Sequence, residues 1–415
     1  MNKNPFTSNT FTQIWLNHFN QKKARLTYNF IPDLSFIKKS LFPLYINIGG
    51  TNTKGICYKL VDNSLKEYKN KVFLIYDVPT YMNLEATLNK KSSLKIDKLK
   101  QYPGYICELE KYNSFNDYMV SVVSKKSRYK YNTYKKRLES SFDINYKMFH
   151  GDITKDEYDY LFKAFKLLLQ KRFISKEIIN NNISPAEWNF YHTVSYEMIL
   201  KKEAALFVTY NKEKPIGISL LFLSKTTVFD TIRVFDIDYS KFRLGTLSII
   251  KQIEWCFNNN IKNLDFSKGY YEYKKRWTNR KYFFQYHILY DSKSLIASSI
   301  VVFLKIFFSL KQFLRNKNIN VLLQKLIFTL KKRKEKKLLE NRKFQYLKNI
   351  ELPNTEKLIN IDLEKLENIS LKRPFYDILY TKKTCEKMTA LFKVKEISNQ
   401  YIIQHKSFVE LYVLK

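Results

Sequence analysis

The order of strand-like and helix-like segments between residues 204 and 290 constrains the fold of this chain most. Three strand-like runs, Ala205 to Tyr210, Ile216 to Leu223 and Thr227 to Phe235, are separated by short turns. This spacing predicts an antiparallel meander. A glycine-containing loop and an apolar helical pattern follow, and strand-like runs return at Asn263 to Ser267 and at about Tyr282 to Tyr290. The region therefore indicates an α+β fold.

The start of that helix, at Arg243-Leu244-Gly245-Thr246, is a candidate phosphate site. A helix that starts after a strand points its unpaired backbone N–H groups outward, where they can hold a pyrophosphate. Gly245 has no Cβ to keep an anion away from the backbone, and Arg243 can add a charge-assisted contact. Coenzyme A is a fitting ligand. Glycine at such a junction also serves turn geometry alone, so this second interpretation stays open.

Two helix starts and a basic segment precede this region. Ser114 with Asp117, and Thr154 with Glu157, have the spacing of capping boxes. Between them, Lys125 to Arg137 interleaves basic residues with tyrosines. Such a segment can contact the phosphates of tRNA or of an anionic lipid-linked substrate. The favoured interpretation is the solvated face of an interdomain helix.

The charge balance allows two explanations. The chain has 73 Lys and Arg against 38 Asp and Glu, a net charge of +35. That excess points to nucleic acid, an anionic membrane or a phosphorylated ligand. With only 8 Gly and 9 Pro among abundant Lys, Asn and Ile, the codon bias of an AT-rich genome explains it equally well. Because 45% of the residues are hydrophobic, a disordered chain is excluded.

The spacing of the cysteines and the length of the apolar runs indicate where in the cell the protein is found. The four cysteines are far apart and form no CxxC pair, which indicates a reducing cytoplasm with no zinc site or disulfide framework. The N-terminal stretch has no signal-peptide core. The uncharged run Ser294 to Leu304 is too short to span a membrane. We expect a cytoplasmic protein, with a peripheral position on the inner membrane as the alternative. The helix Leu295 to Leu314 either lies on an anionic membrane surface or packs across the domains.

A family resemblance covers roughly Ser114 to Tyr290. The stretch FDIDYSKFRLGTLSIIKQIEWCFNNNIKNLDFSKGYYEYKKRW resembles the closing half of the CelD/BcsL-like acetyltransferases, a group of the GNAT superfamily often tied to exopolysaccharide or cellulose biosynthesis. Upstream, SFNDYMVSVVSKKSRYKYNTYKKRLE is similar to the family's helix with a basic connector. The positions that carry the likeness are Asp236, Tyr239, Gly245, Asp265, Phe266, Gly269, Tyr273, Lys274 and Trp277. Phe242 and Leu247 depart from the pyrophosphate-loop pattern of general GNAT enzymes.

The resemblance implies an α+β chain of two tandem GNAT-like domains, as in Fem-type aminoacyl transferases. Each domain would be a mixed, largely antiparallel sheet flanked by helices. We expect the first domain over residues 1–145 and the second, with the acyl-CoA site, over 146–292. A basic helical extension would cover 293–345 and a small appended α/β domain 346–415, where LINIDL, FYDILY and SFVELYVLK read as short strands.

The resemblance also implies roles for individual residues. Asp265 is the first candidate for catalytic base or substrate anchor, although it can instead pair with Lys274 or cap a turn. Lys274 can contact phosphate or the acceptor, or be one more solvated lysine. The acyl donor would be acetyl-CoA, with no metal. The candidate substrate-binding residues are Tyr239, Tyr273, Trp277 and Arg128; large aromatics are more often core.

The leading functional hypothesis is an acetyl-CoA-dependent N- or O-acyltransferase that acts on a sugar or other cell-envelope or exopolysaccharide precursor. Two alternatives remain. One is a Fem-like peptidyl transferase that takes its acyl group from aminoacyl-tRNA. The other is a degenerate GNAT fold that serves as a non-catalytic scaffold. The acceptor would be a small molecule or saccharide, tRNA would be a partner only in the first alternative, and the oligomeric state stays open.

Overall fold

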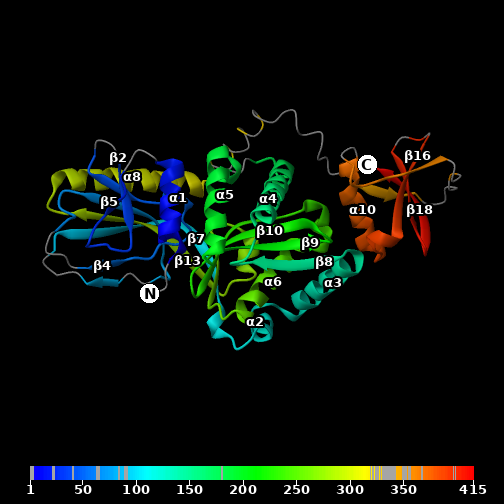
Figure 1. Cartoon of the computed structure of the whole chain (residues 1–415), viewed down its shortest axis with the longest axis horizontal. Coiled ribbons are helices and arrows are strands. Elements are labelled where there is room, and N and C mark those ends of the chain that lie inside the picture. Colours follow the sequence, from blue (N-terminus) through cyan, green and yellow to red (C-terminus); the bar gives the residue numbers. More distant parts are fainter. Residues whose placement is uncertain are drawn as a thin grey trace.

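A computed structural model gives the fold of the protein. It describes residues 4–20, 24–39, 42–61, 66–82, 85–87, 92–178, 181–317, 319, 322, 327, 329, 343–347, 353, 357–365, 368–395, 397 and 399–415. Of the predicted helical extension 293–345, residues 318, 320, 321, 323–326, 328 and 330–342 lie outside this described part. The described elements form two halves side by side and a separate C-terminal unit (Figure 1).

One sheet of eleven strands runs through both halves, in the order β1-β2-β3-β5-β13-β7-β12-β11-β10-β9-β8. Its strands are β1 (Leu26–Thr27), β2 (Ser35–Lys39), β3 (Leu44–Asn47), β5 (Val72–Pro79), β7 (Leu94–Glu108), β8 (Ile144–Phe149), β9 (Ala204–Asn211), β10 (Lys214–Leu223), β11 (Thr227–Phe235), β12 (Asn263–Lys268) and β13 (Arg280–Asp291). A separate pair joins β4 (Lys59–Val61) to β6 (Glu85–Thr87). Only β3 with β5 and β11 with β12 are parallel within the large sheet.

The two halves repeat one arrangement and exchange their last strands. In each half an antiparallel meander, β1-β2-β3 or β9-β10-β11, is followed by one parallel strand, β5 or β12. The next position beside β5 is taken by β13, which comes late in the chain, and the position beside β12 is taken by β7, which comes early. β7 and β13 pair with each other from Leu94 with Asp291 to Ile106 with Arg280. The exchange makes the two halves one continuous sheet.

Helices cover both faces of this sheet. They are α1 (Asn9–Phe19), α2 (Phe115–Val122), α3 (Lys125–Ser141), α4 (Lys155–Ser175), α5 (Pro185–Leu200), α6 (Leu244–Asn258), α7 (Glu272–Lys275) and α8 (Leu295–Asn316), with short 3₁₀ turns η1 (Pro5–Thr7), η2 (Gly50–Asn52), η3 (Leu109–Lys111), η4 (Asn181–Ile183) and η5 (Ile237–Phe242). α1, α4 and α5 share one apolar core with the sheet, whereas α2 and α6 share a second core on the other side. α8 packs on the N-terminal half, over β5 and β13.

The local signals for these helices are confirmed. Ser114 Oγ accepts from the N–H of Asp117 at 3.1 Å, and the Asp117 carboxylate accepts from the N–H of Asn113, so α2 begins in a capping box. Thr154 Oγ1 accepts from the N–H of Glu157 at 3.2 Å at the start of α4. The meander β9-β10-β11 also lies where the alternating runs predict it.

The C-terminal unit is a five-stranded sheet packed on one helix. Its order is β14 (Phe344–Tyr346), β18 (Phe408–Leu414), β17 (Gln400–His405), β16 (Thr389–Val394) and β15 (Leu358–Asn360), with η9 (Glu386–Met388) before β16. The helix is α10 (Ile369–Lys382). FYDILY therefore belongs to a helix, and its interpretation as a strand is wrong. Phe375, Tyr376 and Leu379 lie on one helical face and are all buried.

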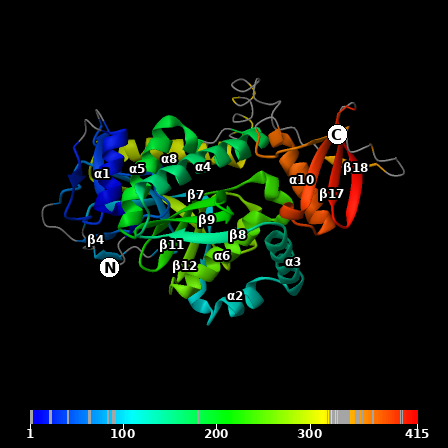
Figure 2. The same cartoon turned by 45° about the vertical axis from the view of Figure 1, so that its right-hand side comes forward.

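α10 attaches this unit to the second half of the large sheet (Figure 2). The rings of Phe142, Tyr239 and Tyr376 contact one another at the junction. The division of the chain into domains at residues 145, 292 and 345 stays a prediction. Residue 145 falls inside β8, and β13, which we placed in the second domain, pairs with strands of the first.

We expect Gly104→Ala to destabilise the fold at the crossing of the two halves. Gly104 pairs with both Lys268 and Tyr282, and a Cβ there would overlap the Tyr282 ring. Displacing that buried ring costs about 1–3 kcal/mol. Gly217→Ala is the matched control, because its Cβ would meet Thr209 at an ordinary 3.5 Å. Urea unfolding measures the free energy of unfolding of both variants. Equal destabilisation by Gly104→Ala and Gly217→Ala would contradict this role of Gly104.

Candidate functional site

β11 and β12 separate shortly after they begin to pair. Their parallel register covers only Thr227 to Phe229 against Asn263 to Asp265. From Asp230 onward, the edge of β11 that faces β12 has no strand partner. A bulge lies at the same point, since Asp230 pairs with Leu221 and Ile232 with Leu220, which leaves Thr231 unpaired. The two strands thus form an opening lined by free backbone groups of β11.

α6 begins beside this opening with free donors. Arg243 precedes it in the left-handed conformation, with φ 58°, and gives no side-chain cap. The N–H groups of Thr246 and Leu247 donate to the Arg243 carbonyl. Within the described residues, no acceptor is found for the N–H groups of Leu244 and Gly245. They remain available to an anion, and the phosphate site at this turn stays a prediction.

Gly245 is needed for packing as well. A Cβ at this position would lie 2.5 Å from Cε1 of Phe235, so the ring at the end of β11 occupies the space that the missing side chain leaves. The turn-geometry interpretation therefore also holds: the glycine lets the end of β11 pack against the first turn of α6.

Arg172 places a second positive charge, besides that of Arg243, near Gly245. The guanidinium of Arg172, near the end of α4, lies 4.5 Å from the centre of the Phe235 ring, the same ring that covers Gly245. Burial lowers the pKa of Arg172. No salt bridge joins it to a carboxylate in the part of the chain that the structure describes. An unpaired, half-buried guanidinium beside a helix N-terminus suits a phosphate group.

Polar side chains with unused hydrogen-bonding atoms lie where the strands separate. Arg233 Nη2 is 2.8 Å from Asp230 Oδ2 and donates to Gln252 Oε1 at 2.5 Å. All three side chains are largely buried. Among the described residues, Asp230 Oδ1, Arg233 Nη1, Gln252 Nε2 and Ser267 Oγ have no hydrogen-bond partner. Buried polar atoms are seldom left unsatisfied, so this cluster is suited to a polar ligand.

Asp265 is enclosed rather than open to a substrate. Tyr282 and Tyr81 donate their hydroxyls to its carboxylate at 2.7 and 2.8 Å, and the Ser267 N–H donates at 2.7 Å. Its side chain is fully buried, and that burial raises its pKa to about 6. The carboxylate joins β12 to residues of the N-terminal half, which is a structural role.

Lys274 is buried too and does not pair directly with Asp265. Its Nζ donates to the carbonyls of Lys268 at 2.9 Å and of Ser267 at 3.2 Å. Burial lowers its pKa to about 8. Lys274 thereby ties α7 to the turn that ends β12, where Ser267 has a φ of 58°. The interpretation as a solvated lysine is wrong.

Four predicted substrate residues lie in different places. The Tyr273 side chain is about one-third exposed, with its ring 6.3 Å from that of Phe266 beside the opening. Trp277 is buried, and its ring stacks on Tyr131 while its carbonyl accepts from Tyr118. Arg128 donates to three carbonyls at the end of α2, which fixes that helix end.

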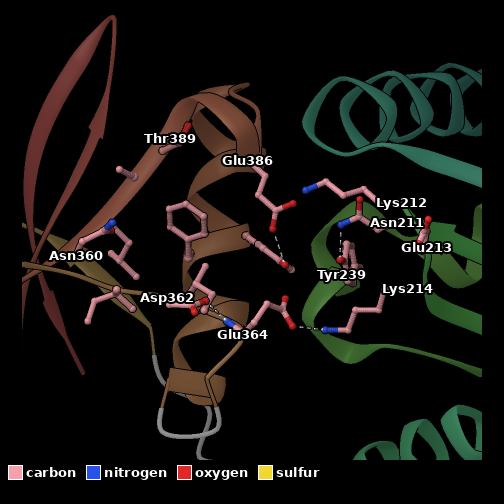
Figure 3. A pocket seen from close by; sticks show the side chains of 16 residues that line it. Asn211, Lys212, Glu213, Lys214, Tyr239, Asn360, Asp362, Glu364, Glu386 and Thr389 are labelled. Carbon is pink, nitrogen blue, oxygen red and sulfur yellow. Dashed lines mark hydrogen bonds and ion pairs between the residues drawn. The ribbon is translucent and has the colours of Figure 1, made fainter.

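Tyr239 lies away from the opening, at a cleft between the second half and the C-terminal unit. This cavity of about 760 Å³ is lined by residues of the β9–β10 turn and of the segment around α10 (Figure 3). Asn211 donates to the Tyr239 hydroxyl at 3.0 Å, and Lys214 bridges to Glu364 across the cleft at 2.8 Å. Tyr239 is 3% exposed and packs against Tyr376. The structure thus brings Arg243, Gly245 and Tyr273 near the opening, and separates Tyr239 and Arg128 from it.

The sequence interpretation missed Arg172, Asp230, Arg233 and Gln252. Asp230 and Arg233 are charged residues within an apolar strand, and this departure from the apolar pattern could have marked them as site residues. Arg172 had no such signal, because it stands in a helix far from β11 in the sequence. Across the described residues, no group of three His, Cys, Asp or Glu side chains gathers to hold a metal ion.

Comparison with known proteins identifies the domain that holds this site. Residues 125–275 match the family described as an acetyltransferase (GNAT) domain. Residues 125–275 are therefore similar to a GNAT-type acetyltransferase domain, and the predicted α+β, GNAT-like fold is confirmed. The CelD/BcsL-like subgroup stays a prediction. No curated protein matched the chain.

Several solved structures are similar at low identity. A conserved protein of unknown function from Bacteroides thetaiotaomicron has a TM-score of 0.45 at 9% identity, covering 69% of this chain and 91% of its own. FemX has a TM-score of 0.44 at 9% identity, with 68% and 92% covered. A tandem GNAT protein from the clavulanic acid biosynthesis pathway has a TM-score of 0.31 at 8% identity, with 61% and 77% covered.

We expect Asp265→Asn to change the pH dependence of stability. The pKa of Asp265 rises from 3.8 to about 6 on folding, so its stabilising contribution is present below the lower value and is lost as the pH rises through the higher one. Between pH 4 and pH 7, the free energy of unfolding of the wild type should fall relative to the variant by on the order of 2–3 kcal/mol. Urea unfolding across this range measures the difference. Asp152→Asn, at an exposed position, is the control; parallel curves for wild type and Asp265→Asn would refute the assignment.

Proposed function

We propose that this protein transfers an acyl group from an acyl-coenzyme A thioester to an amine or hydroxyl group, in the opening between β11 and β12. One observation carries the proposal: the two strands pair through Phe229 and then separate, with α6 starting beside the gap. A ligand that is extended and carries an anionic end fits both features. Coenzyme A combines a pantetheine arm, which holds two amide groups, with a pyrophosphate.

The free donors support one arrangement of coenzyme A in the opening. The pyrophosphate would accept hydrogen bonds from the N–H groups of Leu244 and Gly245, with Arg172 and Arg243 balancing its charge. Beyond Phe229, the pantetheine amides would pair with the backbone of β11, as a short added strand does. This path leads the thioester toward Thr231 and Asp230.

The residues at the end of that path support acyl transfer. The acceptor nitrogen or oxygen attacks the thioester carbonyl, a C–N or C–O bond forms, and the C–S bond breaks. A backbone N–H at the Thr231 bulge is suited to stabilise the oxyanion. Asp230 Oδ1, which has no partner among the described residues, would accept the proton of the acceptor. The coenzyme A thiolate leaves and is protonated.

Asp265 and Lys274 support this site without contacting substrate. Asp265 holds β12 to the N-terminal half through Tyr81 and Tyr282. Lys274 fixes the turn after β12. We therefore propose Asp230 as the base in place of Asp265, and treat Asp265 and Lys274 as positioning residues.

The second half is better suited to the reaction than the first. β3 and β5 also separate after three pairs, Leu44 to Ile46 against Val72 to Leu74. Among residues 48–61 and 66–71, however, no α-helix starts beside that gap, so it lacks the N-terminal donors that α6 supplies. The end of β5 is closed instead by the ion pair of Asp77 with Lys268, at 2.6 Å.

For the donor we propose acetyl-CoA, and for the acceptor a sugar or other cell-envelope precursor. Both rest on the sequence resemblance over residues 114–290. Aminoacyl-tRNA stays the alternative donor because α3 exposes a row of lysines, Lys125, Lys126, Lys130, Lys135 and Lys136. Titration of the protein with coenzyme A and with tRNA separates the two donors.

We expect Arg172→Glu to weaken coenzyme A binding at least ~10-fold, because it places a negative charge where the pyrophosphate would lie. Lys163→Glu makes the same charge change on an exposed face of α4 and is the matched control. Isothermal titration with coenzyme A measures both. Equal affinities for Arg172→Glu and wild type would remove the proposed pyrophosphate position.

We expect Asp230→Asn to lower kcat by about 10²–10⁴-fold while coenzyme A affinity changes little, since general-base catalysis contributes that much. Release of free thiol from acetyl-CoA, with a set of hexoses and amino sugars as acceptors, provides the assay. Asp152→Asn serves as control. A non-catalytic scaffold would release no acceptor-dependent thiol in the wild type, and an unchanged kcat in Asp230→Asn would exclude Asp230 as the base.

A further inference from the structure

α8 presents large apolar side chains to solvent along its whole length. Leu295, Phe303 and Ile306 are 86%, 66% and 64% exposed. The other exposed apolar residues of this helix are Ile296, Val302, Phe307, Leu310, Phe313 and Leu314. A set of this size on one element marks a binding surface, because soluble surfaces rarely gather so many apolar residues.

The helix is apolar on two opposite faces. Ala297, Val301, Leu304 and Phe308 are buried against β5 and β13, with the Phe308 ring stacked on Tyr286 at 3.9 Å. With 3.6 residues per turn, Leu295, Val302, Ile306, Leu310 and Phe313 fall on the side away from this core. Below, these five residues are called the outer stripe. It runs for about 27 Å at 1.5 Å per residue.

The charged residues of α8 stay off the outer stripe. Lys305 turns to the side and pairs with Asp97 at 2.6 Å. Arg315 turns inward, its guanidinium 3.5 Å from the centre of the Tyr102 ring. Lys311 is exposed on a flank, and Lys293 and Lys317 are exposed just beyond the two helix ends. The stripe is therefore apolar, with basic residues at its margins.

We propose that α8 lies in the surface of an anionic lipid bilayer, with the outer stripe buried among the acyl chains. The flanking lysines fit anionic headgroups, and the net charge of +35 adds long-range attraction to such a surface. In the described residues, α8 is the one helix long and apolar enough to span a membrane. Its packing against β5 and β13 instead holds it flat on the sheet, parallel to the surface it would enter.

This inference is independent of acyl transfer, because the outer stripe shares no residue with the opening between β11 and β12. The experiment is co-sedimentation of the full chain with vesicles of equal phosphatidylglycerol and phosphatidylcholine, and with vesicles of phosphatidylcholine alone. The test variant is Val302→Glu with Ile306→Glu, two residues of the outer stripe. The matched control is Val120→Glu with Leu167→Glu, two apolar positions that are similarly exposed on α2 and α4.

We expect the wild type and the control to partition onto the anionic vesicles, more strongly than onto neutral ones, and the test variant to partition at least ~10-fold more weakly. Circular dichroism and coenzyme A titration check that both variants stay folded. Equal partitioning of the test variant and the wild type would overturn the proposal. So would a dimer by light scattering that only the test variant dissociates, with no vesicle binding by the wild type, since the stripe would then bind a second copy.

Discussion

The pairing of β7 with β13 holds the two halves of the protein in one sheet. Each strand comes from one half and lies against the other half's parallel strand, β5 or β12. Separating the halves would expose the unpaired edges of both. The buried carboxylate of Asp265 strengthens the same junction, because it accepts from Tyr81 and Tyr282 across the exchanged strands. The ion pair of Asp77 with Lys268 joins the ends of β5 and β12.

This exchange also sets the shape of the candidate site. β7 pairs with β12 at Cys107 and Ile106, which draws β12 toward the middle of the sheet as β11 continues with β10. The gap between β11 and β12 follows from that geometry. A parallel pair that ends early leaves backbone donors without partners, and such donors bind an extended polar ligand well. α6 then adds its N-terminus at the open end, and Arg172 adds charge from α4.

The two halves differ at this equivalent place. Both parallel pairs stop after three residues, and both unpaired ends contain a residue in the left-handed conformation, Asp77 in one and Ser267 in the other. In the first half the space beside Asp77 is filled by the Lys268 side chain. In the second half polar atoms of Asp230, Arg233 and Gln252 remain without partners among the described residues. One gap is closed by protein and the other is suited to a ligand.

Local patterns in the sequence predicted the strands, the capped helices and the turn at Gly245 well, because caps and alternating burial depend on neighbouring residues. The strand exchange could not be predicted, since β5 and β13 are about 200 residues apart and the sequence of neither strand indicates which strand it pairs with. For the same reason the sequence made Asp265 the first candidate for the base, although two distant tyrosines enclose it. FYDILY suits a strand by composition, and only its packing at the junction makes it a helix.

Amide hydrogen exchange with and without coenzyme A tests directly whether acyl-coenzyme A binds along the open edge of β11. Bound ligand should slow exchange in peptides that cover residues 230–235 and 244–247, while peptides from β3, β5 and the C-terminal cleft stay unchanged. Saturating coenzyme A that leaves residues 230–235 unprotected, or that protects the cleft around Lys214 and Glu364 instead, would contradict it.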